Sequence, residues 1–346
     1  MKTYLLPNHG NFYKANLHMH TTVSDGKMTP EETKKLFQDH GYSIVAFTDH
    51  DVICPHHDLT DENFLALTAF ETYYNTDLFG VMDYDFVQTY HLSFFAKDPN
   101  NVVCPAFSKR YVERAHSLQY VTKEMESFDF DRTYSQKYLN EIIDLANRAG
   151  FLVSLNHPVW SLQNYRDYGN LQGLWGIEVY NTGCVQCGLP DTAQPFSDFL
   201  LDGKNIFPIA ADDAHSTRTC CGGFVMIKAE KLEYGTVINA LERGDFYASS
   251  GPEINELFLE DGVLKIRCSP AQKIFVNTER RTSFSVEADT EPLTKAQFNL
   301  TDYLFKTKSA GKEKLPWKPF FRVTVQGQDG NCAYTRAFWL EELGLL

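Results

Sequence analysis

The stretch at residues 16–26 constrains the fold and chemistry of this chain more than any other feature. It reads Asn-Leu-His-Met-His-Thr-Thr-Val-Ser-Asp-Gly. The alternating run at residues 13–17 predicts a strand, and His18 and His20 lie two residues apart, so both imidazoles project from one face of it. Asp25 follows in a Ser-Asp-Gly turn, where a short carboxylate can reach back over the strand end. We therefore expect two nitrogens and one oxygen to converge as metal ligands.

The same pattern, a short apolar run that ends in or carries metal-binding residues, recurs along the first 250 residues. Its composition and periodicity predict further strands at residues 43–47, 64–70, 86–96, 151–155, 174–180, 206–211 and 224–228. Helices are expected at residues 29–40, where Thr29 and Pro30 open the helix, and at residues 105–150, 193–201 and 236–243. This alternation indicates an α/β fold.

At least five of the predicted strand ends carry ligand-type residues. A β/α barrel builds its active site from parallel strands that present functional groups at their C-terminal ends. An open doubly wound sheet is the alternative, but it would concentrate the ligands at one switch point. The pattern favours a barrel over residues 1–251.

The character of the chain changes after Ser250-Gly251-Pro252. Short alternating runs at residues 257–259, 264–267, 274–277 and 321–325 predict a small β-sandwich-like domain over residues 252–346. Residues 307–319 are rich in lysine and polar side chains, which predicts an exposed loop. The expected role of this domain is to cover one edge of the barrel.

The charge balance bears on the class of partner. With 32 basic and 45 acidic residues the net charge is −13, and no Lys/Arg-rich run occurs, so duplex nucleic acid is not expected as a partner. No stretch approaches the roughly 20 apolar residues of a membrane span, and no signal peptide is evident, so the expected location is the cytoplasm. Eight irregularly spaced cysteines, Cys184 and Cys187 among them, predict reduced thiols in the core and loops.

Nine residues with suitable donor atoms fall at or near the predicted strands. They are His18, His20, Asp25, His50, Glu71, His91, His157, Asp213 and His215. A single histidine of this kind is more often a hydrogen-bonded structural residue than a ligand. Their coincidence with strand ends favours a metal centre, and mixed imidazole and carboxylate donors suit divalent manganese, iron or zinc.

Four short motifs resemble those of the PHP family, the polymerase and histidinol phosphatase superfamily of metal-dependent phosphoesterases. The motifs are His18-Met-His20 with Ser24-Asp25-Gly26, Thr48-Asp-His-Asp51, Asn156-His-Pro158 and Asp213-Ala-His215. Their order and spacing are similar to the family over about residues 13–250. The resemblance implies a distorted (β/α)7 TIM-like barrel with two or three divalent metal ions. More weakly, Ser249 to Pro252 and Phe338-Trp339 resemble the appended β domain of the carbaryl-hydrolase-like branch.

The resemblance also implies a division of the ligands. His18, His20, Glu71 and Asp213 would hold one ion, Asp25, His50 and His215 a second, and Glu71, His91 and His157 a third, with Glu71 bridging. Other branches often have histidine where this chain has Asp25. That difference shifts the expected preference toward harder ions such as manganese or iron and leaves zinc open.

The expected function is hydrolysis of a small phosphate ester, of the nucleotide or sugar phosphate class, by a metal-bridging hydroxide. The candidate catalytic side chains are Asp51, which can orient His50 or shuttle a proton, and Arg218, which can clamp a phosphate or simply face solvent. One alternative is hydrolysis of a non-phosphate ester or carbamate. Another, from a different class, is a non-catalytic binding module that metal ions stabilise.

Overall fold

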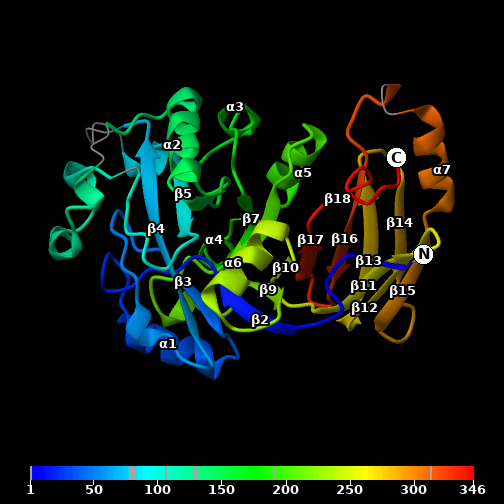
Figure 1. Cartoon of the computed structure of the whole chain (residues 1–346), viewed down its shortest axis with the longest axis horizontal. Helices are drawn as coiled ribbons and strands as arrows, with labels where there is room; N and C mark the ends of the chain where they lie inside the picture. The colour runs from blue at the N-terminus through cyan, green and yellow to red at the C-terminus, as the bar shows by residue number, and fades with distance from the viewer. Residues whose placement is uncertain (1, 78–82, 106, 128–130, 190–191, 312–313) are drawn as a thin grey trace.

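The computed structural model describes the whole chain except residues 1, 78–82, 106, 128–130, 190–191 and 312–313. Figure 1 shows a mixed α/β part on the left and a β-rich part on the right, and both chain ends lie on the right. Within the described residues, no helix has the length and apolar character needed to cross a membrane.

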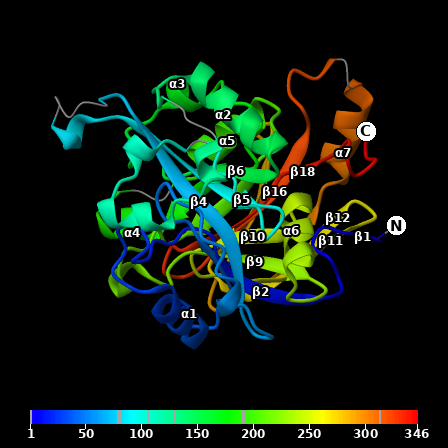
Figure 2. The ribbon, with the colours of Figure 1, turned by 60° about the vertical axis from the view of Figure 1, so that its left-hand side comes forward.

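A fourteen-stranded sheet runs through both parts of the molecule. In the α/β part it contains β2 (Asn11–Asn16), β3 (Ile44–Phe47), β4 (Leu65–Asn75), β5 (Thr89–Ala96), β6 (Phe151–Leu155), β7 (Gly176–Asn181), β8 (Phe207–Ala211), β9 (Phe224–Ala229) and β10 (Phe246–Ser249). Their spatial order is β10-β9-β2-β3-β4-β5-β6-β7-β8. Figure 2 shows the long strand β4 crossing this layer. Every strand predicted in this part is present.

Strand directions differ from the expectation of a parallel barrel. The strands β2, β3 and β4 are parallel, and so are β6, β7 and β8. However, β5 is antiparallel to both β4 and β6, and β9 is antiparallel to β2. The parallel expectation is therefore wrong at β5 and β9, because apolar content reports the burial of a strand and not its direction.

The two ends of this strand series meet without forming a ladder. Among the described residues, no hydrogen-bonded pairing joins β8 to β9, so the sheet is not a closed barrel. Instead, the Asp212 carboxylate after β8 accepts hydrogen bonds of 2.6 to 2.9 Å from the backbone N–H groups of residues 221–223, just before β9. A Cβ on Gly223 would lie 2.4 Å from the carbonyl oxygen of Ala211, so this close approach requires glycine.

The helices are α1 (Pro30–Asp39), α2 (Gln136–Arg148), α3 (Tyr165–Tyr168), α4 (Thr182–Gln186), α5 (Gln194–Leu201), α6 (Tyr234–Arg243) and α7 (Thr301–Ala310). The start of α1 matches the prediction, because Thr29 and Glu32 form a capping box and Phe37 is buried. The helix expected over residues 105–150 is wrong before Gln136. There the described residues form only three 3-10 turns, η3 (Lys109–Tyr111), η4 (Ala115–Tyr120) and η5 (Met125–Ser127). A buried apolar stripe occurs only within α2.

The β-rich part contains two sheets. One has the order β1-β11-β12-β15, with β1 (Lys2–Tyr4), β11 (Ile254–Glu260), β12 (Val263–Ala271) and β15 (Leu293–Asn299). The large sheet supplies the other through β13 (Lys273–Thr278), β14 (Ser283–Glu287), β16 (Phe320–Gln326), β17 (Cys332–Thr335) and β18 (Phe338–Trp339). The loop predicted at residues 307–319 is wrong at its start, because α7 continues to Ala310 and buries Thr307. Residues 312–313 of that prediction lie outside the described residues.

Candidate metal centre

A cavity of about 410 Å³ opens where β3, β4, β5, β6 and β8 bring the predicted ligands together. Seven of those nine residues line it, together with four others: Asp25, His50, Glu71, Tyr73, Asn75, His91, Glu113, His157, Trp160, Asp213 and His215. The remaining two, His18 and His20, are 1% and 0% exposed and contact the same carboxylates. The structure therefore gathers all nine predicted residues around one cavity.

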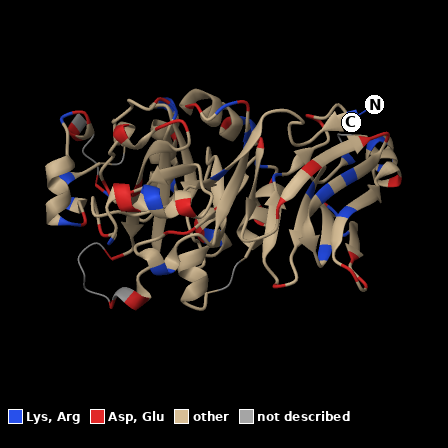
Figure 3. Cartoon of the chain, turned by 90° about the horizontal axis from the view of Figure 1, so that it is seen from below, with Lys and Arg blue, Asp and Glu red and all other residues tan. Residues whose placement is uncertain are grey.

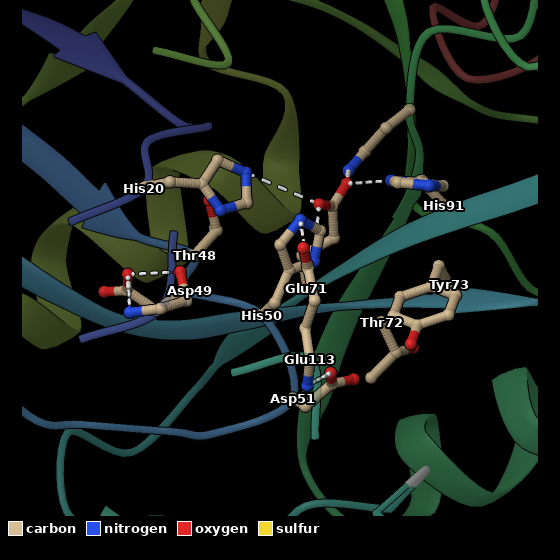
Figure 4. A network of polar contacts seen from close by, with 12 residues as sticks. His20, Thr48, Asp49, His50, Asp51, Glu71, Thr72, Tyr73, His91 and Glu113 are labelled. Carbon is tan, nitrogen blue, oxygen red and sulfur yellow. Dashed lines mark hydrogen bonds and ion pairs between the residues drawn. The ribbon is translucent and has the colours of Figure 1, made fainter. Parts of the chain in front are cut away.

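Glu71, which lies within β4 and not at its end, is the centre of the cluster. Five imidazole nitrogens lie within 3.7 Å of its carboxylate oxygens: His18 Nε2 at 3.2 Å, His20 Nε2 at 3.4 Å, His50 Nδ1 at 3.3 Å, His91 Nδ1 at 3.2 Å and His157 Nε2 at 3.7 Å. Figure 4 shows His20, His50 and His91 pointing toward it. Burial alone would raise the pKa of Glu71, but His18 and the other imidazoles hold it well below its usual value.

Two further carboxylates flank Glu71. An Asp213 oxygen lies 3.4 Å from His18 Nε2 and 3.2 Å from His20 Nε2. Asp25 lies 3.1 Å from His215 Nε2 and 3.6 Å from His20 Nδ1. Burial tends to lower the pKa of His215, but its hydrogen bond to Asp25 and the negative charges of Asp213 and Asp25 together raise that pKa to about 9. The two nitrogens of His20 thus face different carboxylates.

Among the described residues, three groups of donor atoms are tight enough to share an ion, with all atoms of a group within 4.8 Å of one another. They are His20, Asp25, His50 and His215; His18, Glu71 and His157; and His18, His20 and Asp213. The first group contains the three residues that the family resemblance implies for the second ion, Asp25, His50 and His215, and it also contains His20. His91 lies beside Glu71 but in none of these groups. The division of ligands among ions therefore stays a prediction.

The donor atoms fit divalent cations. The Nδ1 atoms of His20, His50 and His91 are buried and make no hydrogen bond among the described residues. Moreover, the Nε2 atoms of His18 and His20 lie only 3.1 Å apart. These nitrogens lie beside carboxylates without forming hydrogen bonds to them, which costs free energy, and a cation between the nitrogens and the carboxylates would satisfy both.

The backbone is strained at two residues of the cluster and at Asp51, which follows the cluster residue His50. His157, Asp213 and Asp51 have φ values of 26°, 50° and 67°, in the left-handed region that disfavours residues with a side chain. Such residues concentrate at functional sites, where surrounding contacts hold them in place. Two of the three are predicted ligands.

The structure places Asp51 outside the cavity. Its side chain is fully buried and forms an ion pair with Arg132, and its second oxygen accepts a hydrogen bond of 3.1 Å from the backbone N–H of Glu113. The neighbouring Asp49 accepts hydrogen bonds from Thr21 and Ser24 and so holds the turn before Asp25. Asp51 does not line the cavity, and its expected role in orienting His50 or moving a proton stays a prediction.

Arg218 also lies away from the cavity. It belongs to the short 3-10 turn η6 (Thr217–Thr219), is exposed, and is absent from the residues that line the cavity. The structure therefore supports the solvent-exposed interpretation of this residue over the phosphate clamp.

Several residues of the site were not identified from the sequence. Glu113 lies 3.4 Å from His50 Nε2, and burial together with Asp25 raises its pKa to about 7. Tyr73 and Trp160 form part of the wall, and Glu178 of β7 contacts His18. Glu178 had a usable signal, because it is the single acid on an otherwise apolar predicted strand.

In Figure 3, Lys and Arg and Asp and Glu occur in both parts of the chain, with several Lys and Arg on the strands of the β-rich part. Among the described residues that line the cavity, none is Lys or Arg. An anionic ligand there would therefore find no Lys or Arg among the described lining residues to balance its charge.

Comparisons with known proteins give matches at the level of structure alone. No family model and no curated protein matches this sequence. Several solved structures align with the chain, among them the following three. A two-domain protein from Bacteroides vulgatus, described as containing a predicted PHP-like metal-dependent phosphoesterase, is 14% identical over 97% of this chain and 98% of that protein, with a TM-score of 0.42.

The other two matches cover less of the chain. An amidohydrolase from Chromobacterium violaceum with bound sulfate is 15% identical over 67% of this chain and 96% of its own, with a TM-score of 0.41. A lesion-specific endonuclease from Pyrococcus furiosus is 14% identical over 67% and 56%, with a TM-score of 0.40.

Proposed function

We propose that this protein is a metal-dependent hydrolase of small phosphate esters, of the nucleotide or sugar phosphate class. The observation that carries the proposal is the convergence of imidazoles and carboxylates on an open cavity, where buried nitrogens lie beside carboxylates without forming hydrogen bonds to them. A purely structural cluster would have satisfied these nitrogens internally.

In this proposal the nine residues hold two or three divalent ions of manganese, iron or zinc. When bound, such ions supply polarisation of a phosphoryl oxygen and a lowered pKa for a water molecule. The chain supplies the positions of the ligands through Glu71, and the aromatic rings of Tyr73 and Trp160 form a wall for the organic part of the substrate. Because no Lys or Arg lines the described cavity, the ions would balance the charge of the phosphate.

The proposal retains two structural interpretations. One is that β2 to β9 form a distorted TIM-like barrel. It is supported by the hydrogen bonds that Asp212, after β8, accepts from the backbone N–H groups of Gly222 and Gly223, just before β9. The other is that residues 1–251 and 252–346 are the catalytic and β-sandwich-like domains. Residues 2–4 pair with β11, however, so the first residues of the chain extend the second unit.

The test uses metal-stripped protein and manganese. The wild-type protein with manganese is expected to hydrolyse p-nitrophenyl phosphate, and Asp213→Asn is expected to abolish this. Asp302→Asn, an exposed acid on α7, is the matched control and should leave activity unchanged. Activity in Asp213→Asn equal to wild type would overturn the proposal.

The same assay separates the alternatives. Turnover of p-nitrophenyl acetate or a carbamate, with no turnover of phosphate esters, would favour the non-phosphate hydrolase. Stabilisation by manganese without turnover of either substrate class would favour the non-catalytic binding module.

A further inference from the structure

Strand β7 carries none of the predicted ligands, yet it lies between the ligand-bearing strands β6 and β8. We propose that Glu178 on this strand is a positioning residue that aligns His18 and His157 and thereby couples two metal positions. The inference deepens the proposed metal-dependent function and rests on it.

The first contact of Glu178 fixes the orientation of His18. One carboxylate oxygen lies 2.6 Å from His18 Nδ1, and both side chains are almost fully buried, at 2% and 1% exposed. A buried carboxylate at Nδ1 keeps the proton on that nitrogen and leaves Nε2 as the donor toward an ion. His18 Nε2 is the atom that faces Glu71 and Asp213.

The second oxygen of Glu178 holds the backbone of another ligand. It accepts a hydrogen bond of 2.9 Å from the backbone N–H of His157. His157 has a φ of 26°, a conformation that needs external contacts to persist. One carboxylate therefore fixes both the ring of His18 and the chain at His157, two residues far apart in the sequence.

Asn181, at the end of the same strand, extends this arrangement. Its side-chain amide donates to the second oxygen of Glu178 at 3.1 Å and to Asp213 at 3.3 Å. Thus β7 contacts ligands that follow three other strands: His18 after β2, His157 after β6 and Asp213 after β8.

The coupling between the two metal positions follows from the donor groups to which His18 belongs. His18 belongs both to the group with Glu71 and His157 and to the group with His20 and Asp213. Loss of the Glu178 carboxylate would release a ligand of both groups at once. Residues that orient a ligand in this way typically contribute about 10- to 100-fold to metal affinity.

Glu178→Gln is the sharpest test because it keeps the size of the side chain. The new amide can accept a hydrogen bond at only one end, so it cannot serve both His18 and the His157 N–H. Glu279→Gln is the matched control: Glu279 is also buried, accepts a hydrogen bond of 2.7 Å from Tyr303, and lies in the β-rich part.

The readout is manganese binding to metal-stripped full-length protein, followed by electron paramagnetic resonance and by elemental analysis after dialysis. Glu178→Gln is expected to weaken binding about 10- to 100-fold at two positions together, while Glu279→Gln binds as wild type. Wild-type affinity in Glu178→Gln, or loss at one position alone, would overturn the inference. Circular dichroism reports folding, and if Glu178→Gln does not fold, Asn181→Ala must still weaken binding relative to Glu279→Gln.

Manganese binding is measured without turnover of a substrate. Failure of the proposed function can therefore be told apart from failure of the positioning role of Glu178. A wild-type protein that hydrolyses no phosphate ester, but loses manganese in Glu178→Gln, would refute the proposed substrate class and leave the positioning role standing. A wild type that hydrolyses the ester, with unchanged metal binding in Glu178→Gln, would refute the positioning role alone.

Discussion

Asp51 and Arg132 form an ion pair in which neither side chain has any exposed surface. Burial tends to lower the pKa of the Arg132 guanidinium, but Asp51 raises it above its usual value. The guanidinium also lies 4.9 Å from the centre of the Tyr73 ring, which lines the cavity. The pair therefore supports the cavity wall from behind.

Asp51→Ala is expected to destabilise the protein by about 3–5 kcal/mol, because it leaves the Arg132 charge buried without its partner. Urea denaturation of the metal-free protein measures this free energy. The control is Asp131→Ala, which removes an exposed ion pair with Arg110 and should cost less than about 1 kcal/mol. Equal effects of the two variants would contradict the structural role of Asp51.

Asp25→Ala is expected to lower the metal content of the protein by one ion per chain. Asp25 contacts His215 and His20 Nδ1 and lies in the group that also contains His50, whereas His18 and Asp213 form part of another. Elemental analysis of the dialysed protein gives the stoichiometry. Loss of every ion, or of none, would show that the division of ligands is wrong.

His215 should make the stability of the metal-free protein depend on pH. Its pKa rises from 6.5 to about 9 in the folded state, where the hydrogen bond to Asp25 and the charges of Asp213 and Asp25 together outweigh burial. The resulting stabilisation is fully present below the unfolded pKa and is lost as the pH rises through about 9. Urea midpoints of wild type and His215→Gln should therefore differ most near about pH 6 and converge near about pH 10. A pH-independent difference would contradict this assignment.

Arg218→Ala is expected to leave both kcat and KM for a phosphate ester unchanged, because Arg218 is exposed and lies outside the cavity. Trp160→Ala should raise KM for an aryl phosphate by up to about tenfold, since an aromatic contact contributes about 0.5–1.5 kcal/mol. Steady-state kinetics with wild type, Arg218→Ala and Trp160→Ala make the comparison. A large rise in KM for Arg218→Ala would restore it as a phosphate ligand.

The residues that gather around the cavity could be predicted from the sequence, because each follows or interrupts a strongly apolar run. His50 after β3 and His157 after β6 are examples in which burial of the strand fixes the position of the next residue. Strand direction could not be predicted in this way. His91 comes from the middle of an antiparallel strand, and only the pairing with β4 and β6 brings it beside Glu71.

The polar contacts that support the predicted ligands could not be predicted from the sequence either. Glu178 and His18 are separated by 160 positions, so their contact exists only after β2 and β7 have been placed. The pairing of Asp51 with Arg132 spans 81 positions in the same way. Local patterns describe which face of an element is buried, whereas these contacts depend on the packing of distant elements.

The pairing of β1 with β11, together with that of β10 with β17, limits how this protein can be cut or grafted. A chain shortened at residue 251 would leave β1 without its partner and expose the edge of β10. Unpaired edges of this kind invite strand exchange between molecules and aggregation. An engineer who moves the metal cluster to another scaffold would therefore need to transfer the β-rich part with it, or cap β10 with a new strand.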